Sequence, residues 1–349
     1  MKISINSKFI EGPYGGGEKF SKYLRDFLTE KGETVVNSLE DDDIDLILHV
    51  NPFPFLTKAS AYSFFDAYEY KIKHPSTVIV QRINECDERK NTKYMNDLLR
   101  VASNYSDYVV YIASWLKPLI KAKKACQVIL NGADQSIFNH DGKNFWDGRG
   151  KMKIVTHHWG NNYMKGHDIY QKIDKLLNNK YFKELFEFTF IGNYPSDLTY
   201  KNTKMIEPLT DKELAKELRK HHLYITASRN EPAGMHHIEG ALCGLPILYM
   251  NSGALPEYCK GFGIEFNETN LEEKLLEMRK KYRDYVKKII KYDHTAKKMA
   301  EEYNSLFKKL YKNRGLYRIQ TTKKSISLFK IKIISKLFSL RWKIKKHLK

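Results

Sequence analysis

The fold is decided by residues 229–258, which read RNEPAGMHHIEGALCGLPILYMNSGALPEY. This stretch follows a short apolar run at residues 222–227 and contains another at residues 246–250. Both runs are typical of buried strands. Pro232 marks the start of a helix between them, and Gly244 marks its end. A strand, a helix and a second strand in this order predict a parallel crossover in an α/β sheet.

Two glutamates lie in this crossover, Glu231 in the loop before the helix and Glu239 inside it. In such units a ligand lies beyond the carboxyl ends of the strands, where the helix start at Gly234 offers N–H groups to a phosphate or a sugar hydroxyl. The pattern predicts a site for a polyhydroxylated, phosphorylated ligand such as a nucleotide sugar. The alternative is that Glu231 pairs with a nearby Lys or Arg and that Glu239 is an ordinary solvated helix residue.

The stretch resembles the signature of family 4 of the retaining glycosyltransferases. The matching features are an E-x7-E element at Glu231 and Glu239, Gly-Leu-Pro at residues 244–246, and a loop that ends in Pro256 and Glu257. The resemblance implies the GT-B fold, in which two Rossmann-like domains enclose the active site. It also implies that Glu231 holds hydroxyls of the transferred sugar and Glu239 those of the ribose. The donor-binding helix start would comprise Gly234, Met235 and His236.

The N-terminal half begins with a predicted strand at residues 3–10, a glycine-rich segment at 12–17 and a helix at about 18–31. The backbone N–H groups of Gly16 and Gly17 can approach a diphosphate, although strand-glycine-helix turns also occur for packing reasons. This segment stands where the resembled family has its glycine loop. Asn-Gly-Ala-Asp at residues 131–134 resembles the family's turn near the domain junction, and its alternative is a tight turn at a strand end.

The C-terminal half repeats the strand-helix pattern. Strands are predicted at residues 153–157 and 186–191, and a helix is predicted from Lys165 to about Leu177. Alternation of this kind in both halves predicts two doubly wound α/β domains.

The resemblance assigns the donor phosphates to Lys165 and the border of the nucleobase to Gly192, Pro208 and Leu209. Relatives usually carry an arginine five or six residues before the lysine, where this chain has Trp159 and Gly160. The group that makes the second phosphate contact is therefore left open.

Residues 81–87, QRINECD, follow a strand predicted at residues 77–80 and leave the sheet at the ligand edge. In the resembled family the corresponding loop lies near the transferred sugar. Arg82, Asn84 and Asp87 are therefore the candidate catalytic residues from the N-terminal domain. The alternative is that they make loop hydrogen bonds and salt bridges.

No metal is expected, and no cofactor other than the nucleotide-sugar substrate. Residues 41–45 have the D-x-D spacing of metal-dependent glycosyltransferases of another fold, but they precede a predicted strand at 46–50 and so lie at the wrong edge of the sheet. A solvated turn is predicted there. The histidine pairs at 157–158, 221–222 and 236–237 lack the His-x3-His spacing of a zinc site on a helix.

Length and composition fit two domains, because 349 residues with 42% hydrophobic content can bury two cores. We predict an acceptor-side domain at residues 1–145, a nucleotide-sugar-binding domain at 146–317 and a tail at 318–349. No run approaches about 18 apolar residues, no apolar signal region opens the chain, and the four cysteines show no paired spacing. These features predict a cytoplasmic protein.

The net charge of +19 raises the alternative of a nucleic-acid-binding protein. The tail, however, holds 11 of the 60 Lys and Arg residues and no acid, which leaves 49 basic against 41 acidic side chains elsewhere. We therefore expect no nucleic-acid partner. From Ile326 to Leu348 apolar residues recur at steps of three and four, which predicts a basic amphipathic helix on an anionic membrane surface. The alternative is a last helix packed against the protein.

The predicted function is that of a metal-independent retaining glycosyltransferase, peripheral on the cytoplasmic face of a membrane. It would move a sugar from a nucleotide-diphosphate sugar to a glycan or lipid-linked acceptor. A nucleotide-sugar epimerase or a phosphorylase on the same fold is the alternative enzyme.

Overall fold

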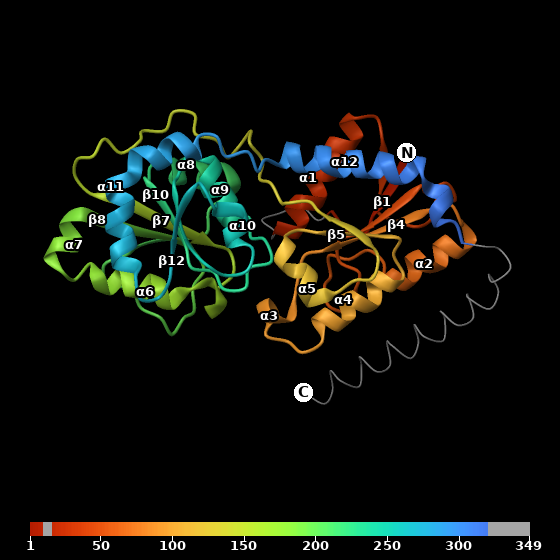
Figure 1. The fold of residues 1–349 in the computed structure, drawn as a ribbon, viewed down its shortest axis with the longest axis horizontal. Coiled ribbons are helices and arrows are strands. Elements are labelled where there is room, and N and C mark those ends of the chain that lie inside the picture. Colours follow the sequence, from red (N-terminus) through yellow and green to blue (C-terminus); the bar gives the residue numbers. More distant parts are fainter. Residues whose placement is uncertain (10–15, 320–349) are drawn as a thin grey trace.

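The computed structural model describes residues 1–9 and 16–319. They form two α/β domains side by side, each built around a six-stranded parallel sheet (Figure 1). The two doubly wound domains expected from the strand-helix alternation are confirmed. The amphipathic helix predicted in the tail lies outside the described residues.

The N-terminal sheet has the strand order β2-β1-β3-β4-β5-β6. Its strands are β1 (Lys2–Ile5), β2 (Thr34–Val36), β3 (Leu46–His49), β4 (Val78–Ile83), β5 (Tyr108–Tyr111) and β6 (Ala125–Val128). The helices of this domain are α1 (Gly16–Glu30), α2 (Phe64–Lys73), α3 (Asp87–Lys90), α4 (Met95–Asn104) and α5 (Lys117–Ile120). As predicted, α1 buries an apolar stripe that includes Phe20, Leu24 and Phe27.

The C-terminal sheet has the strand order β12-β11-β10-β7-β8-β9. Its strands are β7 (Met152–His158), β8 (Phe186–Gly192), β9 (Lys204–Ile206), β10 (Leu223–Thr226), β11 (Ile247–Met250) and β12 (Gly263–Phe266). The helices are α6 (His167–Leu176), α7 (Lys180–Leu185), α8 (Asp211–Arg219), α9 (His236–Leu242), α10 (Leu255–Cys259) and α11 (Leu271–Ile289). The predicted crossover is thus β10-α9-β11.

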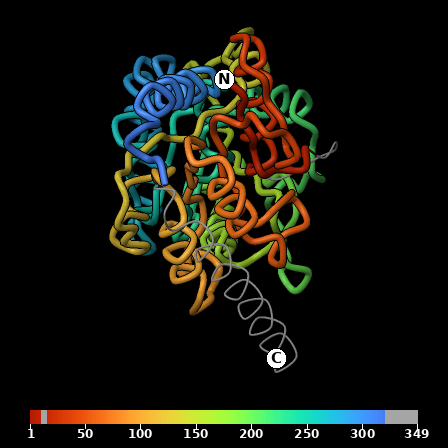
Figure 2. Tube along the Cα trace, turned by 90° about the vertical axis from the view of Figure 1, so that its right-hand side faces the viewer, coloured from red at the N-terminus to blue at the C-terminus, as the bar shows by residue number. Residues whose placement is uncertain are grey.

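The chain then returns to the first domain through α12 (Ala296–Lys312), which packs against α1. The rings of Phe20 and Tyr303 meet edge to face, with their centroids 5.2 Å apart. Figure 2, in which the N-terminal domain faces the viewer, shows α12 in blue at the upper edge of that domain. Where the chain crosses back, a Cβ on Gly132 would lie 2.0 Å from the carbonyl oxygen of Thr295, so only glycine fits there.

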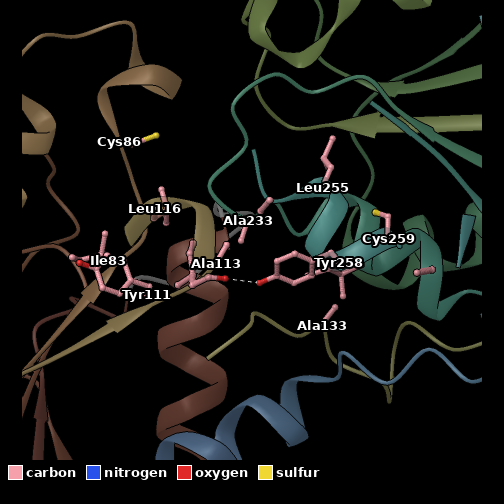
Figure 3. Close-up of a cluster of buried hydrophobic side chains, with 14 of the residues drawn as sticks. Ile83, Cys86, Tyr111, Ala113, Leu116, Ala133, Ala233, Leu255, Tyr258 and Cys259 are labelled. Carbon is pink, nitrogen blue, oxygen red and sulfur yellow. Dashed lines mark hydrogen bonds between the residues drawn. The ribbon is translucent and has the colours of Figure 1, made fainter. Parts of the chain in front are cut away.

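A buried cluster continues from one domain into the other (Figure 3). At its centre the hydroxyl of Tyr258 on α10 donates a hydrogen bond of 2.8 Å to the carbonyl oxygen of Ile112, and it accepts one of 2.6 Å from the amide of Asn131. Trp115 adds a bond of 3.2 Å from its indole N–H to the carbonyl oxygen of Pro232. The contact between the domains is therefore part of the folded core.

Two details differ from the predicted elements. β1 ends at Ile5, well before residue 10. β4 extends to Ile83 and is buried throughout, so Arg82 lies inside the strand and not in the loop after it. Lys143 packs on the C-terminal domain, where its amine donates a bond of 2.5 Å to the carbonyl oxygen of His221.

No helix within residues 1–9 and 16–319 is both long and apolar enough to cross a bilayer. The four cysteines are free thiols, and Cys126 is the exposed one.

Candidate active site

Two of the loops of the C-terminal domain that face the N-terminal domain follow neighbouring strands, β7 and β10. β7 and β10 pair directly, although the chain visits β8 and β9 between them. Lys165 follows β7 and Glu231 follows β10. The crossover therefore places both residues where the strand order reverses, which is where open α/β sheets bind ligands.

A cavity of about 610 Å³ lies between the two domains. The wall that the N-terminal domain forms includes Lys19, Lys22 and Arg25 of α1. The opposite wall contains four of the predicted donor-binding residues, which are Gly192, Pro208, Leu209 and Glu239. The volume is in the range of ordinary small-molecule sites.

Glu239 lies on α9 at the edge of this cavity, and its side chain is only 5% exposed. Its Oε2 lies 2.8 Å from Nε2 of His157, and its Oε1 lies 3.1 Å from Nζ of Lys19. Burial alone would raise the pKa of Glu239, but Lys19 and His157 outweigh that effect and lower the pKa to about 2. Glu239 is therefore a buried carboxylate, and the alternative of a solvated helix residue is wrong.

Lys19 reaches Glu239 from the other domain. Its Nζ also lies 2.5 Å from Oδ1 of Asp211, at the start of α8. Burial alone would lower the pKa of Lys19, but Glu239 and Asp211 outweigh it and raise the pKa. The ammonium thus forms an ionic bridge across the cavity between the two domains.

Glu231 occupies a second, more enclosed position. Its Oε2 accepts hydrogen bonds from Ser228 Oγ at 2.7 Å and from Lys165 Nζ at 3.3 Å, and it pairs with Arg89 Nη2 at 3.0 Å. Burial alone would raise the pKa of Glu231, whereas Lys165 and Arg89 hold it below its ordinary range. The sequence had also allowed Glu231 simply to pair with a nearby Lys or Arg. Glu231 does pair with both Lys165 and Arg89, and this charged cluster is buried at the junction of the domains.

The helix start between the two glutamates is crowded. A Cβ on Gly234 would lie 2.6 Å from the ring of His236 and 2.9 Å from Cδ of Glu231. A Cβ on Gly16, the first residue of α1, would lie 2.9 Å from Cγ of Met235. Gly16 and Met235, both predicted to bind the donor, therefore meet across the junction, and Gly17 follows on α1.

Gly192 closes β8 beside the cavity. Its φ is 120°, and a Cβ there would lie 2.0 Å from the carbonyl oxygen of His158 on the paired strand. A larger residue would force β7 and β8 apart at the predicted base-binding edge.

The histidines around the site are buried and make internal contacts. Nε2 of His236 lies 2.9 Å from Oγ1 of Thr226, and Nε2 of His158 lies 2.7 Å from the hydroxyl of Tyr170. Burial, reinforced by neighbouring positive groups, lowers the pKa of His158 and His236 well below the ordinary value. Both rings are therefore neutral at neutral pH. Across the described part of the chain, no group of three His, Cys, Asp or Glu side chains is placed to hold a metal ion.

The three candidate catalytic residues of the N-terminal domain do not line the cavity. Arg82 is 2% exposed, and its guanidinium lies 3.9 Å from the ring centroid of Phe20 and donates a bond of 2.8 Å to Asn131 Oδ1. Asp87 accepts hydrogen bonds from the backbone of residues 94–96, which fixes the start of α4. Asn84 is half-buried in the loop before α3.

Arg82 contacts the site indirectly. Arg82 binds the side-chain oxygen Oδ1 of Asn131. The side-chain nitrogen Nδ2 of the same residue donates a bond of 2.9 Å to the carbonyl oxygen of Ala233. Ala233 lies in the loop between Glu231 and α9. In this arrangement Arg82 positions the loop that carries Glu231.

The acidic segment at residues 41–45 forms the solvated turn that was predicted. Lys2 Nζ lies 2.6 Å from Asp43 and 3.2 Å from Asp41, and the Lys2 amide donates to Asp45 at 2.9 Å. These residues lie beside the starts of β1 and β3, at the opposite edge of the sheet from the cavity.

Three residues of the site, Lys19, Arg89 and His157, were not predicted from the sequence. Lys19 and Arg89 belong to the N-terminal domain and meet their carboxylates, Glu239 and Glu231, only through the contact between domains. The sequence indicates these two residues only through their neighbours. Lys19 comes just after the glycine-rich segment at residues 12–17, and Arg89 comes just after residues 81–87.

Comparison with known proteins identifies the fold. No protein-family profile and no curated protein matches the sequence. Among solved structures, sucrose-phosphate synthase from Thermosynechococcus elongatus is similar at 11% identity, covering 89% of this chain and 98% of its own, with a TM-score of 0.60. A glycosyltransferase from Rickettsia africae ESF-5 is similar at 13% identity, over 89% and 98%, with a TM-score of 0.63. HepE from Anabaena, solved in complex with UDP, is similar at 15% identity, over 88% and 100%, with a TM-score of 0.64.

These neighbours are GT-B proteins, and the likeness extends over both domains. The expected GT-B arrangement of two Rossmann-like domains is therefore confirmed.

Proposed function

We propose that this GT-B protein is a retaining glycosyltransferase of the family 4 type. It would transfer a sugar from a nucleotide-diphosphate sugar to a glycan or a lipid-linked acceptor. The observation that carries the proposal is the position of the E-x7-E pair: both glutamates are buried, ionised and held at the junction of the domains by cations. A fold-level likeness does not by itself require this arrangement.

The cavity suggests how the donor lies. Glu239 would accept hydrogen bonds from the ribose hydroxyls, while Gly192, Pro208 and Leu209 border the base. Lys165 would contact the diphosphate, and Glu231 beside it would hold the hydroxyls of the transferred sugar. The UDP complexes of HepE, a protein with this fold, support a nucleotide diphosphate as part of the ligand.

The proposed reaction breaks the bond between the anomeric carbon and the phosphate oxygen and forms a bond from that carbon to an acceptor hydroxyl on the same face. The acceptor proton passes to an oxygen of the departing phosphate. Lys165 and the fixed backbone N–H groups near Gly16 and Gly234 would stabilise the charge that develops on the diphosphate. These groups supply the stabilisation that a cation provides in metal-dependent enzymes, so we propose that transfer is metal-independent.

The test is hydrolysis of donor sugars by the purified full chain, measured across UDP-, GDP- and ADP-sugars with and without excess chelator. We expect one nucleotide series to be hydrolysed, with the released sugar initially in the anomeric form of the donor, and no loss of rate on chelation. A rate that chelator abolishes and manganese restores would contradict metal independence. Release of an epimerised sugar, or a requirement for inorganic phosphate, would instead support the epimerase or the phosphorylase.

A further inference from the structure

Glu231, Arg89 and Lys165 form a charged cluster with an unequal number of positive and negative groups. The two cations share one carboxylate oxygen, at 3.0 Å and 3.3 Å, and the three side chains are 8%, 8% and 15% exposed respectively. Glu85 also acts electrostatically on Lys165, but its carboxylate pairs with Lys90 at 2.9 Å. The other arginine of this region, Arg229, pairs with Asp168 and Glu268. Within residues 1–9 and 16–319, one positive charge of the cluster therefore has no acid of its own, and a buried charge without a counter-ion is costly.

Arg89 is the member of the cluster that comes from the opposite domain. It lies on α3, and its Nη1 donates hydrogen bonds to the carbonyl oxygens of Met164 at 3.0 Å and Arg229 at 2.7 Å. Asn230 strengthens the same contact by donating a bond of 3.2 Å to the carbonyl oxygen of Glu88. The guanidinium is thus fixed against the two C-terminal loops that carry Lys165 and Glu231.

We propose that Arg89 and Lys165 together bind the sugar-bearing phosphate of the donor, so that the phosphate site is complete only when the two domains are in contact. This rests on the function proposed above. The phosphate supplies the missing negative charge. The contacts above use three of the five N–H donors of Arg89, and the two that remain, on Nε and Nη2, can bind two phosphate oxygens at once. Glu231 holds both cations in place and leaves them a net positive charge.

Two consequences follow from the origin of Arg89 in the N-terminal domain. A nucleoside diphosphate reaches Arg89 through its second phosphate and therefore stabilises the contact between the domains. A nucleoside monophosphate lacks that phosphate and stabilises the contact little. The charge that develops on the leaving diphosphate is then stabilised from both domains.

The test compares nucleoside diphosphates with monophosphates, using UDP and UMP, GDP and GMP, and ADP and AMP as probes in calorimetry on the full chain. For the base that the wild type prefers, we expect Arg89→Met to weaken diphosphate binding about 10- to 100-fold and to change monophosphate binding by less than about threefold. Arg89→Lys should recover part of the loss, because it keeps the charge without the planar fork. Lys93→Met removes an exposed cation a few residues further along and should bind as the wild type does.

The ratio of the two affinities separates phosphate binding from a purely structural role. If Arg89→Met weakens both ligands equally, or neither, the assignment of Arg89 is wrong while the proposed function stands. If the wild type binds no nucleotide of any series, both proposals fail. Melting temperatures of the variants identify a folding defect, and Arg89→Lys then provides the decisive comparison.

Discussion

Glu231 and Glu239 are only eight positions apart, but their surroundings separate their chemistry. Glu239 borders the cavity with His157 and Lys19, whereas Glu231 sits in the enclosed cluster with Arg89 and Lys165. A carboxylate that binds a non-reacting part of a substrate contributes to affinity, and one beside the reacting sugar contributes to turnover.

We predict that Glu239→Gln weakens nucleotide binding about tenfold, because a charge-assisted hydrogen bond to the ribose is lost. Glu231→Gln should instead lower kcat at least about tenfold with a smaller effect on the dissociation constant of the nucleotide. Calorimetry and donor hydrolysis measure the two quantities. Glu184→Gln, at an exposed position of α7, is the matched control. Wild-type rates and affinities in both variants would remove these glutamates from the site.

Lys143 is a buried lysine outside the cavity. It is 8% exposed, and burial lowers its pKa to about 7 from an ordinary value of 10.5. The unfolded chain therefore binds more protons than the folded protein between pH 7 and 10.5. Stability from this group is fully present above pH 10.5 and is lost as the pH falls towards 7.

We predict that Lys143→Met flattens the dependence of the free energy of unfolding on pH between about 7 and 10. The slope that Lys143 contributes is at most about 1.4 kcal/mol per pH unit. Urea unfolding at a series of pH values measures it, and Lys151→Met, at an exposed lysine nearby, should keep the wild-type slope. An unchanged slope in Lys143→Met would show that the buried amine does not titrate in this window.

At the scale of elements, α12 connects the end of the C-terminal domain to the core of the N-terminal one. Tyr303 and Phe307 of this helix are fully buried, with ring centroids 5.8 Å apart, and Tyr303 also contacts Phe20 of α1. The helix that carries Lys19 is therefore held in place partly by a segment from the far end of the sequence.

We predict that Phe307→Ala destabilises the protein by about 3–5 kcal/mol, since it removes a large buried ring from a packed core. Lys308→Ala, on the exposed face of the same helix, should change the stability by less than about 0.5 kcal/mol. Urea denaturation measures both. Equal stabilities of the two variants would mean that α12 can leave the N-terminal core without cost.

At the scale of the whole molecule, the basic tail predicted as an amphipathic helix lies outside the described residues, and its membrane contact is a prediction from sequence. Just before the undescribed residues, Tyr317 packs on the hydrophobic core of the N-terminal domain. A truncation after Ile319 therefore removes the basic stripe and keeps that contact.

We predict that the full chain co-sediments with vesicles containing phosphatidylserine and that rising salt releases it, because each basic group contributes about 1 kcal/mol near an anionic surface. The chain ending at Ile319 should stay in solution and still hydrolyse donor. Full-length protein with Lys332, Lys336, Lys343 and Lys346 replaced by Gln keeps the apolar stripe and should bind weakly. Equal sedimentation of the intact and truncated chains would refute the anchor.

The two doubly wound domains were predictable because their signals are local. Short apolar runs and glycines at turns are signals that depend on residues a few positions apart, and α1, α6 and α9 lie where those signals indicate. The same holds for the ligand edge of the C-terminal domain, because a crossover fixes which end of each strand carries the loop. Gly192 and Glu239 line the cavity for this reason.

Contacts between domains were decided only by the tertiary structure. Arg82 follows an apolar run and was expected in the loop after it. Pairing with β5 instead continues β4 to Ile83, and the guanidinium of Arg82 packs on the ring of Phe20 rather than facing solvent. Lys19 and Arg89 meet Glu239 and Glu231 across sequence separations of 220 and 142 residues, respectively. No spacing rule links such pairs, since their distance depends on how the two finished domains pack. The sequence determined the two domains and the carboxylates, and the packing of one domain on the other determined which cations face them.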